Sequence, residues 1–115
     1  MTVTPRRGGT LNLLVDPEPT VLVTVTNPGD PQLLVSAKVT EGLLAYDFDL
    51  NPKAQLATSW SSSPDSREFT FTLRKAVKWH DGADFTAADV AFSLLLLKEV
   101  HPRGRAAFAN VADVR

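Results

Sequence analysis

Cysteine is absent from this sequence of 115 residues, which excludes disulfide bonds, thiolate metal sites and a lipid-anchored cysteine within these residues. An excess of either sign of charge is also absent, with 12 Lys and Arg against 13 Asp and Glu. The formal net charge is −1, so the chain carries no electrostatic footprint for nucleic acid or for an anionic membrane. No apolar run approaches the length of a membrane span or the apolar region of a signal peptide. The remaining composition is that of an ordinary globular protein, and a chain of this length normally forms one domain.

Catalytic motifs are missing as well, because no glycine belongs to a Gly-x-Ser-x-Gly elbow or to a phosphate-binding loop. The run His80–Asp81–Gly82 could suggest metal or acid–base chemistry, but a zinc site needs several converging ligands, and His101 lies beyond a whole predicted helix. The favoured interpretation is structural: Trp79 packs, Asp81–Gly82 turns the chain, and His80 forms a local hydrogen bond. We therefore expect no catalytic residue, no metal site and no cofactor. The alternative is a small enzyme built around His80 and Asp81.

A second pattern imitates the start of a calcium-binding loop. Asp47, Asp49 and Asn51 have the spacing of the first three ligands of such a loop. The sixth position requires glycine but holds Pro52, and the twelfth requires a bidentate acid but holds Thr58. We therefore expect a solvated turn here and no ion site.

An antiparallel hairpin is the clearest local prediction. Phe69, Phe71 and Leu73 alternate with polar residues, which places the three apolar side chains on one face of a strand. A serine- and proline-rich turn precedes this strand. The pattern predicts that Leu56–Trp60 and Glu68–Arg74 pair as a hairpin.

A helix that starts at a capping box follows the hairpin. Thr86 stands at the N-cap position, and Asp89, three residues later, is placed to accept from the amide of the cap residue. Phe85 and Val90 occupy the two positions of a hydrophobic staple around this cap. The sequence therefore predicts a helix from Ala87 to about Val100.

This second helix is apolar over nearly its whole circumference, which is typical of a helix covered on more than one side. Each Leu or Phe that becomes fully buried stabilises a protein by about 1.5–3 kcal/mol, so uncovered side chains favour association. We expect the chain by itself to form a homo-oligomer, by strand exchange or edge pairing. A free-standing module that binds another protein through the exposed apolar helix face is the alternative.

Strand signals near the N-terminus are weaker. Thr10–Val15 alternates and is a strand candidate, which the prolines of Asp16–Pro19 must end. Val21–Thr26 has the composition of a strand, and Asn27–Pro28–Gly29 is typical of a turn.

A first helix is predicted to start with Asp30 as its N-cap and Pro31 at its first position. Apolar residues continue at helical spacing, and Gly42 weakens or ends the helix. Beyond it, Tyr46–Leu50 is predicted to form a short strand that Asn51 and Pro52 stop.

Nearly the whole chain resembles the family 5 extracellular solute-binding proteins, the peptide- and nickel-type receptors of bacterial ABC importers. The resemblance rests on the motifs LATSW, SPD, TFTLR, VKWHDG and FTAADVAFS, which occur in the family's order at Leu56–Trp60, Ser63–Asp65, Thr70–Arg74, Val77–Gly82 and Phe85–Ser93. It extends to four further segments, Gly8–Leu11, Glu41–Leu44, His101–Arg105 and Phe108–Val111.

The resemblance implies an α+β fold, in which an antiparallel hairpin and short strands pack with two helices as part of lobe I of a periplasmic binding protein-like II fold. Residues 1–115 would then be one unit, an N-terminal fragment of a two-lobed receptor. Such a receptor closes its lobes on a solute in the periplasm and delivers it to an ABC permease in the membrane. A start codon directly before a mature N-terminus would explain the missing signal peptide. Arg6–Arg7 is interpreted as solvated charge, because no apolar stretch follows it.

Ligand contacts can be named only through the resemblance. The loop after the first strand borders the cleft in this family, and its residues here are Asp16, Glu18, Pro19 and Thr20. An acid there could form an ion pair with the amino terminus of a peptide. The alternative is that both acids are simply exposed on a proline-rich loop and bind nothing. Phe108 matches an aromatic position near the cleft, or packs in the core. Receptors for peptides, nickel chelates, sugars and opines share these motifs, so the ligand stays open, and we expect this chain alone to bind little.

Overall fold

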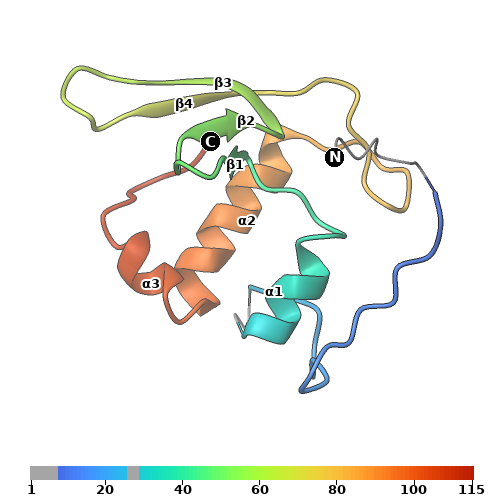
Figure 1. Ribbon diagram of the computed structural model, residues 1–115. Helices are drawn as coiled ribbons and strands as arrows, with labels where there is room; N and C mark the ends of the chain where they lie inside the picture. Colours follow the sequence, from blue (N-terminus) through green and yellow to red (C-terminus); the bar gives the residue numbers. More distant parts are fainter. Residues whose placement is uncertain (1–7, 26–28) are drawn as a thin grey trace.

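The computed structural model describes residues 8–25 and 29–115, which form an α+β arrangement of two small antiparallel sheets and helices (Figure 1). The elements follow the chain as α1 (Asp30–Ser36), β1 (Leu44–Tyr46), β2 (Pro52–Ala54), β3 (Ala57–Ser62), β4 (Phe69–Leu73), α2 (Ala87–Val100) and α3 (Gly104–Ala107). The two sheets lie at one end of α2, and α1 and α3 lie on either side of it (Figure 1). The expectations for Arg6–Arg7 and for Asn27–Pro28 concern residues outside the described ranges.

The predicted hairpin is confirmed. Strands β3 and β4 pair antiparallel, with Trp60 opposite Phe71, and a register irregularity lies between Ala57 and Ser59. The turn that joins them depends on Ser63, whose hydroxyl donates to Asp65 Oδ1 at 2.6 Å and accepts from the Glu68 amide at 2.9 Å. The serine hydrogen bond and the Arg67 amide lower the pKa of Asp65. The turn residues identified in the sequence thus close this hairpin through their side chains.

The strand predicted at Tyr46–Leu50 is wrong, because this segment is mostly a turn. Strand β1 ends at Tyr46, which is paired with Pro52. Pro52 is therefore the first residue of β2, and it does not end a strand as predicted. Asp47 explains the turn: its Oδ1 accepts from the amides of Asp49 at 3.0 Å and Asn51 at 2.8 Å. These bonds, with the Asn51 amide as the largest influence and Lys53 next, lower the pKa of Asp47. The side chain that resembled a calcium ligand therefore organises a turn.

Helix α1 is displaced and shorter than predicted. Gly29 is its N-cap, so Asp30 and Pro31 occupy its first two positions, and it ends at Ser36. The Thr40 amide and hydroxyl both donate to the Ser36 carbonyl, at 2.8 and 2.9 Å. The helix has already tightened before this residue, because the Lys38 amide donates to the Val35 carbonyl and the Val39 amide to the Ser36 carbonyl, both three residues back.

No strand forms at Thr10–Val15 or over the described part of Val21–Thr26, so both strand predictions are wrong over residues 10–15 and 21–25. A strand needs a partner, and no strand among the described residues pairs with either segment. The second segment is held instead by Ser36, whose hydroxyl donates to the Leu22 carbonyl at 2.6 Å.

Helix α2 has the predicted bounds and turns directly into α3. His101 makes the turn, because its Nδ1 accepts from the amides of Arg103 at 3.1 Å and Gly104 at 2.8 Å. Gly104 is buried against α2, and a Cβ added there would lie 2.2 Å from the Leu97 carbonyl oxygen. This close approach fixes how α3 packs on α2.

The chain covers little of its apolar surface. Ala57 is the one apolar residue buried in the described part of the chain, and none of the described large side chains is fully buried. The accessible surface is 9846 Å² for a mass of 12.5 kDa, whereas a compact monomer of that mass exposes about 6,200 Å². No residue of α2 is buried, in agreement with a helix that needs further cover. None of the described helices is long and apolar enough to cross a membrane.

Candidate functional site

A cavity of about 550 Å³ lies between α2, the turn that precedes it and the connection from α1 to β1. Its volume falls within the range of about 300–1,000 Å³ typical of small-molecule pockets. Most of its lining is apolar, and it is formed by Val39, Thr40, Glu41, Gly42, Leu43, Leu56, Val77, Lys78, Trp79, His80, Phe85, Val90, Ser93, Leu94 and Leu97. We call this space the α2 cavity.

The turn that carries Trp79 and His80 forms one wall of the α2 cavity. Gly82, at φ 90°, donates its amide to the Trp79 carbonyl, and Asp81 Oδ1 accepts from the Ala83 amide at 2.9 Å. The Trp79 ring meets the edge of Phe85 with centroids 5.6 Å apart. The structural interpretation of this run is confirmed for the tryptophan and for the turn. The local hydrogen bond expected of His80 is wrong, since its ring bonds to nothing in the part of the chain that the structure describes.

The predicted capping box at the start of α2 is formed. The Thr86 amide donates to Asp89 Oδ2 at 2.7 Å, and the Thr86 hydroxyl donates to the same oxygen at 2.9 Å. The Thr86 amide is the largest influence that lowers the pKa of Asp89, and hydrogen bonds from the Thr86 and Trp79 side chains act in the same direction. Asp89 thus joins α2 to the wall of the α2 cavity.

We expect Asp89 to make stability dependent on pH. Its pKa is lowered from 3.8 in the folded chain, so its contribution is present above pH 3.8 and is lost as the pH falls through the lowered value. Urea unfolding at pH 7 and at about pH 3 should show that Asp89→Asn destabilises the chain at the higher pH and less at the lower one. Asp113→Asn, in the segment after α3, is the control. An equal loss at both pH values would contradict this role.

The charges around the α2 cavity are already paired. Arg74 forms an ion pair with Glu41 at 2.8 Å, and Lys78 forms one with Asp84 at 2.5 Å. The hydroxyl of Ser93, which lines the cavity, is also hydrogen-bonded, because its Oγ donates to the Asp89 carbonyl at 2.7 Å. No group of three or more potential metal ligands occurs among the described residues. The α2 cavity therefore offers mainly apolar surface.

The five ligand contacts inferred from the resemblance lie outside this cavity. Asp16, Glu18 and Thr20 are exposed and Pro19 is half-buried in an irregular segment, while Phe108 is the half-buried C-cap residue of α3. Figure 1 places that segment and α3 on opposite sides of α2. The structure does not bring them together, so their role stays a prediction. Sequence reasoning missed the α2 cavity, although four of the segments with family motifs contribute residues to its lining: Glu41–Leu44, Leu56–Trp60, Val77–Gly82 and Phe85–Ser93.

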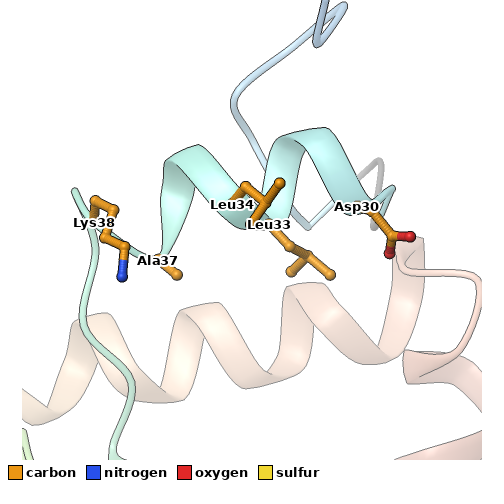
Figure 2. A pocket seen from close by; sticks show the side chains of 5 residues that line it. All are labelled: Asp30, Leu33, Leu34, Ala37 and Lys38. Carbon is orange, nitrogen blue, oxygen red and sulfur yellow. The ribbon is translucent and has the colours of Figure 1, made fainter. Parts of the chain in front are cut away.

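A second, open groove of about 330 Å³ follows α1 (Figure 2). It is lined by Asp30, Leu33, Leu34, Ala37 and Lys38. The acidic residue lies at one end of the helix and the lysine at the other, with the apolar residues between them (Figure 2). We call these five residues the α1 face.

Comparison with known proteins gives one family. The family model for "Bacterial extracellular solute-binding proteins, family 5 Middle" matches residues 31–115. The periplasmic oligopeptide-binding protein OppA of Escherichia coli K12 is 42% identical over 65 residues, which are 56% of this chain and 12% of that protein. No solved structure matches the chain.

Two further relatives have related names. The probable peptide ABC transporter periplasmic-binding protein y4tO of Sinorhizobium fredii is 30% identical over 76 residues, covering 66% of this chain and 14% of the relative. The glutathione-binding protein GsiB of Salmonella typhimurium is 42% identical over 60 residues, covering 52% of this chain and 12% of the relative. The matched segments thus span only a small part of these curated relatives.

Proposed function

Because this chain belongs to the bacterial extracellular solute-binding proteins of family 5, we propose that it is part of a receptor that captures peptides or similar small solutes for an ABC importer. The single observation that carries the proposal is the family match over residues 31–115. The names of the relatives support peptides, glutathione included, as the class of solute. The receptor works in the periplasm, delivers its solute to a membrane permease and performs no chemistry on it.

Residues 1–115 form an N-terminal part of lobe I in this proposal. A second lobe closes on the solute, so that the bound peptide is buried between the lobes. Asp16 and Glu18 then face the amino terminus of the peptide, Pro19 and Thr20 border the cleft, and Phe108 lies near it. The large exposed surface supports this assignment, because a lobe completed by further polypeptide would cover it.

We expect the chain by itself to bind peptide weakly or not at all, because closure between two lobes supplies most of the buried contact. Isothermal titration calorimetry with di- to pentapeptides should detect no binding tighter than about 1 mM. A dissociation constant in the micromolar range for residues 1–115 would contradict the two-lobed mechanism.

A hybrid receptor tests the proposed function directly. The 65 residues of this chain that match Escherichia coli OppA at 42% identity would replace the corresponding segment of that receptor. We expect the hybrid to bind a tripeptide within about tenfold of the affinity of the parent protein, because the segment supplies an equivalent part of the receptor. A hybrid that unfolds cooperatively and binds more than about a hundredfold more weakly would contradict the proposal.

The second candidate function, a free-standing protein-interaction module, is favoured by one observation. Phe92 on α2 is 67% exposed, and Leu95 on the same helix is 38% exposed. A module of this kind would not restore peptide binding in the hybrid receptor, so the same experiment separates the two functions.

A further inference from the structure

His101 joins α2 to α3 through its side chain as well as through its backbone. Its Nδ1 accepts from the amides of Arg103 at 3.1 Å and Gly104 at 2.8 Å, and both amides lie at the start of α3. A ring nitrogen that accepts hydrogen bonds carries no proton, so the imidazole is neutral and its proton is on Nε2. The link between the two helices is therefore made by an unprotonated nitrogen.

Helix α3 begins at the residues that His101 holds. The Arg105 amide donates to the His101 carbonyl at 3.1 Å, and the Phe108 amide donates to the Gly104 carbonyl at 2.8 Å. Gly104 is buried so close to α2 that an added Cβ would lie 2.2 Å from the Leu97 carbonyl oxygen. A helix of four residues has too few hydrogen bonds to be stable alone, so loss of its first contacts affects the whole of it.

Protonation of Nδ1 would replace this acceptor with a donor. The new N–H group would point at the two amide N–H groups of Arg103 and Gly104, so both hydrogen bonds would be lost and the buried Gly104 amide would be left without its acceptor. The C-terminal end of α2 favours a positive charge at His101, whereas the start of α3 disfavours it. The second influence acts by direct contact with the ring nitrogen, so it decides the outcome.

The charged residues around this turn do not favour either form of the ring strongly. They are Asp30 of α1, Lys98 and Glu99 of α2, Arg103 and Arg105 at the start of α3, and Asp113 in the segment after it. Cations and acids occur in equal number, and among residues 8–25 and 29–115 His101 forms no ion pair. The hydrogen bonds to Nδ1 therefore remain the main interaction that depends on its protonation.

From this geometry we infer that His101 is a pH-sensitive switch, which holds α3 on α2 while its ring is neutral and releases α3 when Nδ1 takes up a proton. The released state binds one more proton, so the docked state is favoured at higher pH and is lost as the pH falls through the range in which histidine titrates, about pH 6.5. The effect of Asp89 lies in a separate range, below pH 3.8. The inference concerns α3 alone and does not rest on the proposed function.

Amide hydrogen exchange of the whole chain at about pH 7.5 and about pH 5.5, corrected for the intrinsic effect of pH on exchange, tests the switch. We expect protection of the Phe108 amide to fall about tenfold at the lower pH, which is the change that one proton bound only in the released state produces over this range. His101→Asn offers the same amides an acceptor that does not titrate, so protection should stay high at both pH values. His101→Phe keeps a ring without an acceptor, so protection should be low at both.

His80→Asn is the matched control, because His80 is the second of the two histidines in the chain, and this variant should respond to pH as the native chain does. Equal protection of the native chain at both pH values, or no protection at either, would overturn the inference. A His101→Asn variant that loses protection at low pH as the native chain does would assign the effect to another group. Nitrogen NMR of the His101 ring gives an independent check, since a proton found on Nδ1 at about pH 7.5 would also contradict the switch.

Discussion

Replacing Gly104 with alanine is expected to lower the free energy of unfolding by about 2 kcal/mol, although alanine is usually the better helix residue by about 1 kcal/mol. The added Cβ would lie 2.2 Å from the Leu97 carbonyl oxygen and 2.9 Å from His101 Cβ. The nearer atom belongs to the backbone of α2, so no side-chain rotation removes the clash, and α3 must move away. Urea unfolding followed by circular dichroism measures the loss.

A graded control comes from Gly42, where an added Cβ would lie 3.2 Å from the Leu44 carbonyl oxygen. Small adjustments relieve that contact, so Gly42→Ala should change stability by less than about 1 kcal/mol. Amide exchange gives a second readout, because the Phe108 amide donates to the Gly104 carbonyl at 2.8 Å. An unchanged free energy and unchanged protection of that amide in Gly104→Ala would show that α3 does not pack as described.

Local signals predicted their elements correctly. The capping box of Thr86 and Asp89 fixed the start of α2, because both partners lie within one turn and need no distant residue. The β3–β4 hairpin was predictable for the same reason, since Ser63 and its neighbours close the turn with their own side chains. The family resemblance noted in these motifs is confirmed by the match over residues 31–115.

Predictions failed where a competing local bond or a missing partner decided the outcome. Helix α1 ends early in tight backbone bonds made by the Lys38 and Val39 amides, and the carboxylate of Asp47 holds a turn where a strand was predicted. The segment Thr10–Val15 has strand composition, but pairing depends on residues elsewhere in the chain. Strand propensity alone could not supply that partner.

The α2 cavity could not be predicted for a related reason. Its walls come from segments that are distant in sequence, such as Leu43, Val77 and Leu94, and the hydrogen bond from the Ala57 amide to the Leu43 carbonyl at 2.9 Å helps to hold one wall in place. A single sequence does not show which distant segments come into contact in the fold. The motifs at Glu41–Leu44 and Val77–Gly82 indicated that these segments matter, without indicating that they meet.

Ala57, whose amide donates that hydrogen bond, is the position where we expect a substitution to lower stability most. Ala57 has no exposed surface and is bonded through its amide to Leu43 and through its carbonyl to Gln55, so it joins the two sheets. We expect Ala57→Asp to lower the free energy of unfolding by about 3–5 kcal/mol, because the new carboxylate would be buried without a partner. A loss of this size approaches the whole stability of a small domain, so the variant should be largely unfolded by circular dichroism.

Thr58→Asp is the matched control, since the same charge is placed one residue later on an exposed position of β3. It should change stability by less than about 1 kcal/mol, because the carboxylate stays hydrated there. Two further features would identify the cause of a loss in Ala57→Asp. Lowering the pH should restore part of the fold as the buried carboxyl becomes protonated, and Ala57→Asn should be less damaging at neutral pH because it carries no charge. Equal stability of the variants at positions 57 and 58 would mean that this alanine is not at the centre of the packing, and that the two sheets are joined elsewhere.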